Sequence, residues 1–505
     1  MTIAELLSGL KTRSISGPPD QEVMGIAYDS RLVKSGYLFV AIKGFSVDGH
    51  TYIKDAINRG GVGVVVETIQ DVQTDTSVVQ VEDSRKALAF LSAAFYGEPS
   101  KRLSLIGITG TNGKTTTSYI IRNILETWGE KTGLLGTINY IIDKKVLTPS
   151  HTTPESLDLQ RYLAEMADIG TRYAVLEVSS HALELQRVGR CSFKIAAFTN
   201  FSQDHLDFHK TMKEYFSAKS MLFDHLGNDG IAVLNHDDPE IRGLAAGLNC
   251  NVVTCGIEEG AMLRAENIKE PVANDMAQAV PDGLSFDIRT PEDRFTVESE
   301  LIGHFNVYNI LMSVGIAYAL GIDRDTIIEG VRTAKAVEGR FEKIDEGQEF
   351  NCIIDYAHTE DALKNLLKSA RLITGRRIIT VFGCGGDRDR TKRPKMGAAA
   401  SGLSDLVVIT SDNPRTEGPM EIIRDITRGI KKGEYIVRPD RAGAIREAVS
   451  MAGKGDTLLI AGKGHESYQE ISGIKHPFSD KQVVKQAIRD LKPACRQARS
   501  KIKDQ

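Results

Sequence analysis

The N-terminal part of the chain alternates short apolar runs with stretches of helical periodicity. The runs at 36–42 (GYLFVAI) and 61–67 (GVGVVVE) are rich in β-branched and aromatic residues, and we predict a strand for each. Residues 84–97 carry apolar side chains at helical spacing, with Ser84 as the expected N-cap. The segment 96–102 (YGEPSKR) combines glycine, proline and charge, which is typical of a linker. We therefore predict a small α/β domain over residues 1–98.

A second alternation of strands and helices follows this linker. The apolar runs at 103–109, 173–180 and 195–200 have the length of strands, and the segment 115–130 places its apolar residues on one helical face. Those residues are Ile120, Ile121, Ile124, Leu125 and Trp128. Alternating strands and helices favour a mostly parallel, doubly wound sheet, so we predict such a domain over residues 99–335.

Four further apolar runs of strand length recur in the C-terminal part of the chain. They are residues 351–355, 376–383, 405–411 and 456–462. Each leads directly into a polar or glycine-bearing segment, namely YAHTED, CGGDRDR, DNPRTEG and KGHESYQ. Because ligands bind at the carboxyl ends of strands in open α/β sheets, we expect these four loops to line one shared site. The pattern predicts a third, Rossmann-like α/β domain over residues 336–505.

Composition narrows the class of protein. The chain has 505 residues, of which 41% are hydrophobic and 26% charged, as expected for an ordinary globular protein of about three domains. A formal net charge of −4 lacks the basic surplus of a general nucleic-acid binder. We find no apolar run long enough for a membrane span and no secretory signal. Six scattered cysteines without a C-x-x-C pair predict reduced thiols and a cytoplasmic location.

The segment GITGTNGKTTTSYI (107–120) joins a predicted strand to a predicted helix. It departs from the usual phosphate-loop pattern G-x-x-x-x-G-K-[ST], because Ile108 stands where the first glycine belongs. The backbone N–H groups of such a turn and the start of the helix can still bind phosphate. Lys114 offers a positive charge and Thr115 a hydroxyl for Mg²⁺. We therefore predict a nucleotide site here, in preference to a glycine turn with an exposed lysine.

Acidic residues and histidines follow other predicted strands. Glu177 lies in the run 173–180, where its carboxylate is suited to Mg²⁺, although a surface glutamate fits the same pattern. Residues 199–223 bring histidines and aspartates together within a few turns. This cluster leaves open a zinc site, a second Mg²⁺ site or a contact to a substrate phosphate. Lys219, in the same stretch, is expected from the residues alone to be a solvated helix lysine.

A series of motifs occurs in the order that is typical of one family. The motifs are GTNGKTT, EVSSHAL, TNFSQDHLDFH, YFSAKSMLF, GHFNVYN, EGRFE, DYAHT, GCGGDRDRTKRPKMG, SDNPRTE and AGKGHESYQ. With them the chain resembles the Mur ligases over nearly its whole length. The resemblance implies that a substrate carboxylate attacks the γ-phosphate of ATP and becomes an acyl phosphate, from which an amine displaces phosphate. Within the family it implies the addition of meso-2,6-diaminopimelate to the D-glutamate of UDP-N-acetylmuramoyl-L-alanyl-D-glutamate, in peptidoglycan precursor synthesis.

The resemblance also assigns ATP, Mg²⁺ and a lysine carbamate to particular residues. The expected ATP-binding residues are Gly110, Thr111, Asn112, Gly113, Lys114, Thr115, Thr116, Asn309, Arg340 and Asp355. Thr115 and Glu177 are expected to bind one Mg²⁺, and His205 to help hold a second. Lys219 matches a lysine that carries a carbamate in the family, which would supply anionic oxygens to Mg²⁺. The expected catalytic residues are Lys114, Glu177, His205 and Lys219.

The first domain resembles the UDP-binding module of the family through residues 28–53. The residues expected to bind the UDP-muramoyl-dipeptide are Ser30, Thr152, Thr153, Ser179 and Arg187. The two threonines also fit the start of a helix in which Pro154 is the first residue.

The segment DNPR (412–415) matches the signature of the diaminopimelate-adding branch. Diaminopimelate carries a carboxylate that lysine lacks, and a guanidinium can clamp that carboxylate with two charge-assisted hydrogen bonds. We expect Arg415 to form this clamp, although DNPR alone also fits a proline turn with a solvent-facing arginine. The expected diaminopimelate-binding residues are Arg388, Asp412, Asn413, Pro414, Arg415, Gly462 and Glu466.

Three alternatives remain open at this point. They are the L-lysine-adding form of the same ligase, a folylpolyglutamate synthetase, and a P-loop switch ATPase or GTPase, although the chain has no N-K-x-D guanine motif. Glu360 and Leu185 depart from the residues that the family often carries, and we expect Glu360 to alter only the start of a helix. We expect small-molecule substrates, no nucleic-acid partner and a monomer.

Overall fold

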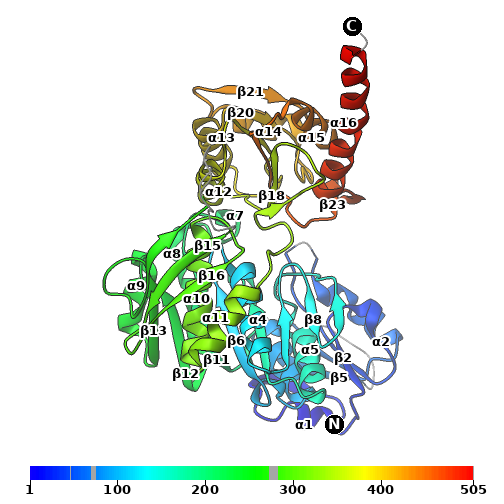
Figure 1. The fold of residues 1–505 in the computed structure, drawn as a ribbon. Helices are drawn as coiled ribbons and strands as arrows, with labels where there is room; N and C mark the ends of the chain where they lie inside the picture. Colours follow the sequence, from blue (N-terminus) through cyan, green and yellow to red (C-terminus); the bar gives the residue numbers. More distant parts are fainter. Residues whose placement is uncertain (46, 70–75, 272–282, 504–505) are drawn as a thin grey trace.

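The computed structural model describes residues 1–45, 47–69, 76–271 and 283–503, with side chains as far as residue 491. Figure 1 shows three α/β units in chain order, from the blue N-terminal unit through the cyan and green central unit to the orange and red C-terminal unit. Each unit is built on its own, mostly parallel sheet. This confirms the predicted α/β class with three units, while the predicted boundaries at 98 and 335 stay predictions.

The first sheet has the order β1-β5-β4-β3-β2, and only β1 runs antiparallel to its neighbour. Its strands are β1 (Thr12–Ser16), β2 (Gly25–Ala27), β3 (Tyr37–Val40), β4 (Gly63–Val66) and β5 (Ser77–Val81). Helices α1 (Ile3–Leu6), α2 (Ile53–Asn58) and α3 (Ser84–Phe95) complete the unit. The predicted cap of α3 is wrong by one residue: the side chain of Asp83 accepts hydrogen bonds from the N–H groups of Arg85 and Lys86.

The central sheet has eleven strands in the order β16-β15-β14-β13-β12-β11-β6-β10-β7-β8-β9. The strands are β6 (Ser104–Thr109), β7 (Thr132–Leu135), β8 (Tyr140–Ile142), β9 (Lys145–Leu147), β10 (Tyr173–Glu177), β11 (Phe193–Phe198), β12 (Leu226–Asn235), β13 (Asn251–Gly256), β14 (Leu263–Lys269), β15 (Leu284–Arg289) and β16 (Arg294–Ser299). The strands from β14 to β7 pair in parallel, and antiparallel strands extend both edges. Strand β6 therefore lies inside the sheet, between β10 and β11.

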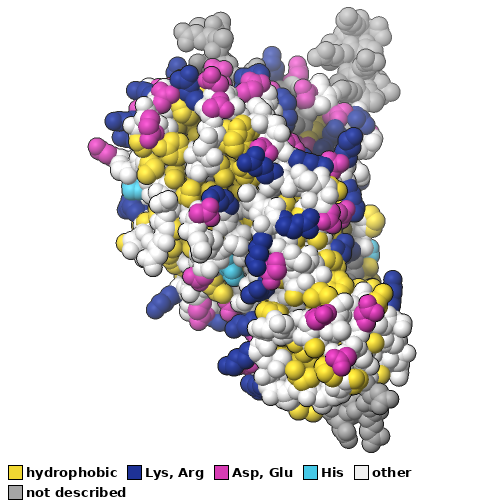
Figure 2. Space-filling model, turned by 90° about the horizontal axis from the view of Figure 1, so that it is seen from below, with side chains coloured by type: hydrophobic (Ala, Val, Ile, Leu, Met, Phe, Trp, Pro, Cys, Tyr) yellow, Lys and Arg dark blue, Asp and Glu magenta, His cyan; other side chains and the backbone are white. Residues whose placement is uncertain are grey.

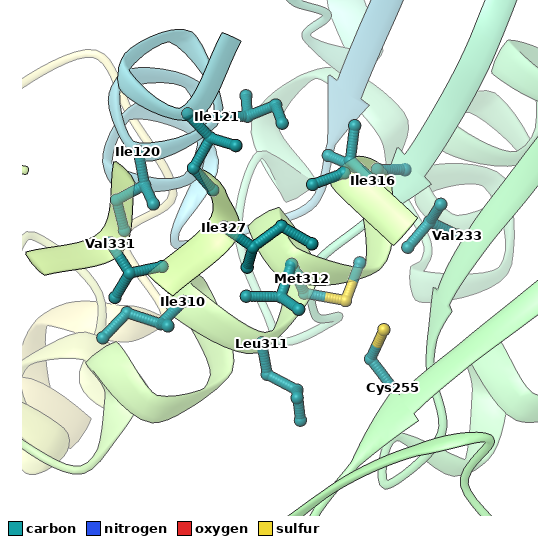
Figure 3. Packing of buried hydrophobic residues seen from close by; sticks show 14 of the residues in the cluster. Ile120, Ile121, Val233, Cys255, Ile310, Leu311, Met312, Ile316, Ile327 and Val331 are labelled. Atoms are coloured by element: carbon teal, nitrogen blue, oxygen red, sulfur yellow. The ribbon is translucent and has the colours of Figure 1, made fainter. Parts of the chain in front are cut away.

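Helices α4 (Lys114–Thr127), α10 (Phe305–Ala319) and α11 (Arg324–Thr333) pack together on the central sheet. In the core that they form, Ile120 and Ile121 of α4 lie near Ile310 of α10 and Val331 of α11 (Figure 3). The predicted apolar face of α4 is buried, apart from Trp128 at its end, which is half-buried. This packing fixes the helix whose first turn follows the glycine loop.

The remaining helices of the central unit carry further motifs. They are α5 (Ser156–Asp168), α6 (Ser180–Glu184), α7 (Leu206–His209), α8 (Met212–Ser220) and α9 (Pro239–Leu244). The predicted helix start at Pro154 is wrong, because α5 begins at Ser156 with Glu155 as its cap. The hydroxyl of Thr153 instead donates to the Glu177 carbonyl at 2.8 Å and accepts from the Ser179 N–H at 3.1 Å.

The C-terminal sheet has the order β17-β18-β22-β19-β20-β21, with only β17 antiparallel to its neighbour. Its strands are β17 (Glu342–Lys343), β18 (Asn351–Asp355), β19 (Ile378–Phe382), β20 (Leu406–Ile409), β21 (Glu434–Val437) and β22 (Thr457–Ala461), and a separate hairpin pairs β23 (Tyr468–Ile471) with β24 (Ile474–Pro477). The helices are α12 (Glu360–Leu372), α13 (Lys392–Leu403), α14 (Pro419–Thr427), α15 (Arg441–Met451) and α16 (Asp480–Lys503). Glu360 is the first residue of α12, so its departure from the family pattern lies at a helix start.

Surface and sequence features agree with the charge balance of the chain. On the face seen in Figure 2, basic and acidic side chains are interspersed with apolar ones.

Among the described helices, none combines the length and the apolar character that crossing a bilayer requires. Of the six cysteines, the five with described side chains are free thiols.

We predict that Asp480→Asn destabilises the C-terminal unit by about 3–5 kcal/mol, the range found when one partner of a buried ion pair is removed. Asp480 accepts two hydrogen bonds from Arg441, at 2.8 and 2.7 Å, and both side chains are fully buried. The arginine cannot lose its charge, so it would stay buried with only the more distant Asp412 carboxylate, 3.8 Å from its Nη1, as a counter-ion. Hydrogen exchange of the β20 and β22 amides measures the loss. The exposed Asp490 on the same helix is the control, and its Asn variant should change stability by less than about 0.5 kcal/mol.

Candidate active site

The glycine loop spans the gap between β6, which ends at Thr109, and α4, which begins at Lys114. Gly110 and Gly113 have φ angles of +143° and +83°, a region that favours glycine. A Cβ on Gly110 would lie 2.0 Å from Thr199 Oγ1, and one on Gly113 would lie 2.4 Å from Asn309 Oδ1. Both glycines are therefore required for close packing. Ile108 causes no conflict, because it is a buried residue of β6 and precedes the loop.

The carboxylate of Glu177 and the hydroxyl of Thr115 meet next to this loop. Thr115 Oγ1 donates to Glu177 Oε2 at 2.8 Å, and the fully buried Glu177 also accepts from the Thr137 N–H and hydroxyl, each at 2.9 Å. Lys114 Nζ donates to the carbonyls of Gly110 and Thr111. Hard oxygen donors beside a phosphate-loop lysine fit a Mg²⁺ ion with a bound phosphate.

Lys219 is buried, with 2% of its surface exposed, so the solvated position expected from the residues alone is wrong. Its Nζ donates to the Gly110 carbonyl at 2.9 Å and lies 4.5 Å from the centre of the Tyr215 ring. Burial lowers the pKa of Lys219 well below its usual value, and the nearby Lys114 ammonium lowers it further. Carbamate formation requires a neutral amine, so this environment fits the modification that the resemblance implies.

His205 lies beside a buried carboxylate that sequence reasoning missed. Its Nε2 is 3.5 Å from Asp204 Oδ2, which also lies 3.5 Å from His358 Nε2. Asp204 Oδ1 is 3.3 Å from Lys392 Nζ, and only 5% of Asp204 is exposed. Although burial disfavours the carboxylate, Lys392, His205 and His358 hold the pKa of Asp204 well below its usual value. The sequence did contain a signal for Asp204, because this residue directly precedes the predicted site residue His205 in TNFSQDHLDFH.

The histidine and aspartate cluster does not assemble as a zinc site in the described part of the chain. There, no three histidine, cysteine, aspartate or glutamate side chains are placed to hold a metal ion. His209 Nε2 instead lies 2.9 Å from Ser180 Oγ, and its ring packs against Tyr215. His205 faces the glycine-loop side, where it lines the same cavity as Thr115.

A cavity of about 840 Å³ joins many of the predicted nucleotide and dipeptide residues. The predicted residues that line it are Thr111, Asn112, Gly113, Lys114, Thr115, Thr116, Thr152, Ser179, His205, Asn309, Arg340 and Asp355. Arg340 Nη2 donates to Thr115 Oγ1 at 3.2 Å, while its Nε is buried with no hydrogen-bond partner among the described residues. A buried, unpaired guanidinium N–H is suited to a phosphate oxygen.

Asp355 and Asn200 both line this cavity. Asp355 accepts hydrogen bonds from the N–H groups of Phe341 and Ala357, each at 2.7 Å, and burial raises its pKa. Asn200 was missed by sequence reasoning. Its side chain accepts from the Asn112 N–H at 2.8 Å and donates to the Asn112 carbonyl at 2.9 Å, which clamps the glycine loop.

The predicted dipeptide residues differ in their surroundings. Thr152 Oγ1 is 3.1 Å from Thr137 Oγ1, next to Glu177, and Ser179 caps α6 by accepting from Ala182. Arg187 donates to the Thr153 carbonyl at 2.9 Å. Ser30 is nearly buried in the first unit and does not line the central cavity. The structure thus brings four of the five predicted residues together.

The four polar loops of the C-terminal sheet meet as predicted. Asn413 Nδ2 donates to Glu466 Oε2 at 2.8 Å, and the buried Lys463 Nζ donates to both Asn413 Oδ1 and Glu466 Oε2. Arg415 Nη1 donates to the Gly386 carbonyl at 2.7 Å, and Tyr356 donates to Glu466 Oε1 at 3.5 Å. Strand order explains the meeting, because β18, β22, β19 and β20 are successive neighbours.

Charges and free acceptors converge at these loops. A Cβ on Gly385 would lie 3.0 Å from Arg415 Nη1 and 3.7 Å from Arg388 Cγ, so both arginines flank one glycine. Asp412 Oδ2 is buried without a hydrogen-bond partner among the described residues. It lies 2.7 Å from where a Cβ on Gly462 would stand. The Asp412 carboxylate also lies 3.8 Å from Arg441 Nη1 and 4.0 Å from Lys463 Nζ. The loops thus bring charges of both signs together, which suits an amino acid with two charged ends.

A chain of contacts connects these loops to the glycine loop. Thr115 is hydrogen-bonded to Arg340, whose guanidinium lies 4.6 Å from the centre of the Tyr356 ring, and Tyr356 in turn contacts Glu466. The nucleotide cavity and the amino-acid loops are therefore adjacent.

Comparison with known proteins agrees with this geometry. The family descriptions "Mur ligase family, catalytic domain", "Mur ligase middle domain" and "Mur ligase, glutamate ligase domain" match residues 22–96, 108–317 and 339–464. A UDP-N-acetylmuramoyl-L-alanyl-D-glutamate--2,6-diaminopimelate ligase of Bacillus licheniformis is 46% identical over 97% of this chain and 100% of its own length. The chain belongs to the Mur ligase family.

Solved structures support the fold of this Mur ligase. One of a ligase with the same printed name has a TM-score of 0.66 at 32% identity, covering 97% of this chain and 99% of that one. A folylpolyglutamate synthase of Mycobacterium tuberculosis complexed with ADP shares the fold at a TM-score of 0.63 and 17% identity, covering 75% of this chain and 92% of its own. Family membership rules out the nucleotide-switch alternative.

We predict that Lys392→Met weakens the docking of the C-terminal unit of this Mur ligase on the central unit. The substitution leaves Asp204 buried with one fewer cation, and truncating one partner of a buried charge pair costs about 2–5 kcal/mol. The radius of gyration from small-angle X-ray scattering should increase. Lys395 is the control, because it lies on the same helix, is exposed and contacts Gln203 across the same boundary. A Lys392→Met scattering curve that overlays the wild type would contradict the prediction.

Proposed function

We propose that this Mur ligase adds meso-2,6-diaminopimelate to the D-glutamate of UDP-N-acetylmuramoyl-L-alanyl-D-glutamate in peptidoglycan precursor synthesis, with cleavage of ATP to ADP and phosphate. The observation that carries the proposal is the near full-length likeness to relatives named for this reaction. The arrangement of the DNPR loop beside a nucleotide cavity supports it. We further propose that the enzyme acts in the cytoplasm as a monomer.

In this proposal the glycine loop holds the phosphates of ATP. Backbone N–H groups of residues 113–116 and the ammonium of Lys114 bind phosphate oxygens, whereas the N–H groups of Thr111 and Asn112 are donated to Asn200. Arg340 supplies its unpaired Nε–H. Thr115, Glu177, His205 and Lys219, as its carbamate, are the residues that would hold Mg²⁺. Mg²⁺, when bound, neutralises charge on the transferred phosphoryl group.

The acceptor is the side-chain carboxylate of D-glutamate. One of its oxygens bonds to the γ-phosphorus as the bond to ADP breaks, which converts a poor leaving group into a good one. The amine of diaminopimelate then attacks the acyl carbon, and phosphate leaves as the amide forms. Thr152, Thr153, Ser179 and Arg187 position the dipeptide. Thr153 does so indirectly, since its hydroxyl is committed to the backbone on either side of Val178.

The C-terminal loops select the amino acid. Arg415 and Arg388 receive the distal carboxylate of diaminopimelate, while Asp412 and Glu466 accept from its distal ammonium. Lysine would leave the guanidinium groups without that carboxylate. Sites that require a substrate group to complete their hydrogen bonds can discriminate by roughly 10⁴–10⁵.

A single assay tests the proposal. Purified protein is given ATP, Mg²⁺ and the UDP-muramoyl-dipeptide, with diaminopimelate, L-lysine or L-glutamate in parallel reactions, and amide product and phosphate are measured. We expect rapid turnover with diaminopimelate only. Equal turnover with lysine would overturn the specificity. Turnover of glutamate in a further reaction, in which a folate replaces the UDP-muramoyl-dipeptide, would favour a folylpolyglutamate synthetase.

We predict that Arg415→Ala lowers kcat/KM for diaminopimelate by at least about 100-fold, because a bidentate charge-assisted pair is lost. The KM for ATP should change little, since Arg415 does not line the nucleotide cavity. Steady-state kinetics with each substrate varied in turn separate the two effects. Arg428→Ala is a control, because Arg428 is an exposed residue of the same unit that pairs with Asp425. An unchanged rate for Arg415→Ala would remove Arg415 from the site.

We predict that Lys219→Ala abolishes turnover and that a short-chain carboxylic acid partly restores it, by replacing the anionic oxygens of the carbamate. Mass spectrometry of the native wild type should also detect the added CO₂. Lys213→Ala is the matched control, because Lys213 lies on the same helix but is exposed. Full activity of Lys219→Ala would show that the carbamate is not needed.

A further inference from the structure

The hairpin of β23 and β24 runs alongside the DNPR segment. Arg415 and Ile471 form a parallel β-bridge, in which the Arg415 N–H donates to the Glu470 carbonyl at 3.1 Å and the Ser472 N–H donates to the Arg415 carbonyl at 2.7 Å. The segment that carries the predicted carboxylate clamp is therefore held to the hairpin by an isolated β-bridge.

Side chains reinforce this backbone pairing. Gln469 Nε2 donates to the Asp412 carbonyl at 2.7 Å, and the Glu470 N–H donates to Asn413 Oδ1 at 2.9 Å. Asp412, Asn413 and Arg415 thus each have a hydrogen bond to the hairpin. The motif AGKGHESYQ ends at Gln469, so the sequence motifs assign no role to the rest of the hairpin.

Arg415 has an unusual backbone conformation. Its φ angle is +53°, in the left-handed region that residues other than glycine seldom adopt. Such a conformation persists only when surrounding contacts determine it. The two backbone hydrogen bonds to β23 and its turn supply those contacts, and they fix the direction in which the side chain leaves the backbone.

The guanidinium of Arg415 contacts the protein through Nε and through Nη1. Its Nε lies 3.3 Å from Glu470 Oε2, and one Nη1 hydrogen is donated to the Gly386 carbonyl. A guanidinium has five N–H donors. Nη2 and one hydrogen of Nη1 therefore remain for a ligand carboxylate. Arg415 and Glu470 are largely buried, with side-chain exposures of 19% and 24%.

We propose that Glu470 is a positioning residue for the amino-acid substrate: its carboxylate, held on strand β23, orients the Arg415 guanidinium so that the outer edge meets the distal carboxylate of diaminopimelate. The inference rests on the proposed function. Glu470 does not touch the substrate and acts only through Arg415.

A second effect of Glu470 on the affinity for diaminopimelate would have the opposite sign. The negative charge of Glu470 also repels the substrate carboxylate, and its removal would then strengthen binding. The geometry favours orientation, because Glu470 lies beside Nε and Gly386 accepts from Nη1, which leaves Nη2 for the substrate carboxylate.

The experiment compares Glu470→Ala with Glu470→Gln in the complete ligase assay. Ala removes the carboxylate beside Nε, while Gln keeps an oxygen there without the charge. We expect Glu470→Ala to raise the KM for diaminopimelate about tenfold, the effect of losing one close contact to a charged group, with the KM values for ATP and the UDP-dipeptide unchanged. Glu470→Gln should restore most of the loss. The exposed Glu434 in the same unit is the control, and its Ala variant should match the wild type.

A double-mutant cycle tests whether Glu470 acts through Arg415. In an Arg415→Ala background, Glu470→Ala should have no further effect on the KM for diaminopimelate. An unchanged or lowered KM in the single Glu470→Ala variant, equal impairment by Ala and Gln, or additive effects in the cycle would each overturn the inference. Those outcomes leave the proposed function standing, whereas a wild type that does not turn over diaminopimelate sinks both.

Discussion

Arg340 spans the boundary between the central and C-terminal sheets, and the proposed meeting of substrates depends on that contact. It follows the linker into the C-terminal unit, donates to Thr115 at the start of α4, and packs on Tyr356 beside the amino-acid loops. A phosphoryl group bound at Thr115 and an amine bound near Glu466 can react only if the two units are docked. The guanidinium suits this position because it is always charged and presents several donors in one plane.

Docking brings charges into a region from which water is largely excluded. Lys219 and Asp204 are almost completely buried, and their pKa values move in the directions that keep the amine neutral and the carboxylate ionised. In such surroundings an electrostatic contact is stronger than in water, and an unpaired charge is more costly. Because Asp204 is buried and charged, the docking of the two units depends on Lys392 and His358, which contact it from the C-terminal unit.

The sheets explain why a few short loops carry so much of the site. Parallel strands end at one edge, so the segments after β18, β19, β20 and β22 are neighbours although they are far apart in the chain. The same rule places Glu177, at the end of β10, next to the loop after β6, because β10 and β6 pair in parallel. The hairpin β23–β24 adds to this by bordering the DNPR segment and holding Arg415.

By itself, the sequence determined that the apolar runs predicted as strands become strands, which loops bear chemistry and that the glycine loop precedes a helix, because these features depend on local periodicity and turn chemistry. It did not predict the strands β14, β15 and β16, which form one edge of the central sheet. Local pattern erred by one residue at the cap of α3 and by two at the start of α5, where neighbouring side chains decide the boundary. Tertiary structure alone decided the burial of Lys219, the ion pairs of Asp204 and the ion pair of Arg415 with Glu470. Those properties depend on residues brought together from distant parts of the chain, and a helical lysine has the same local pattern whether it faces water or a phosphate loop.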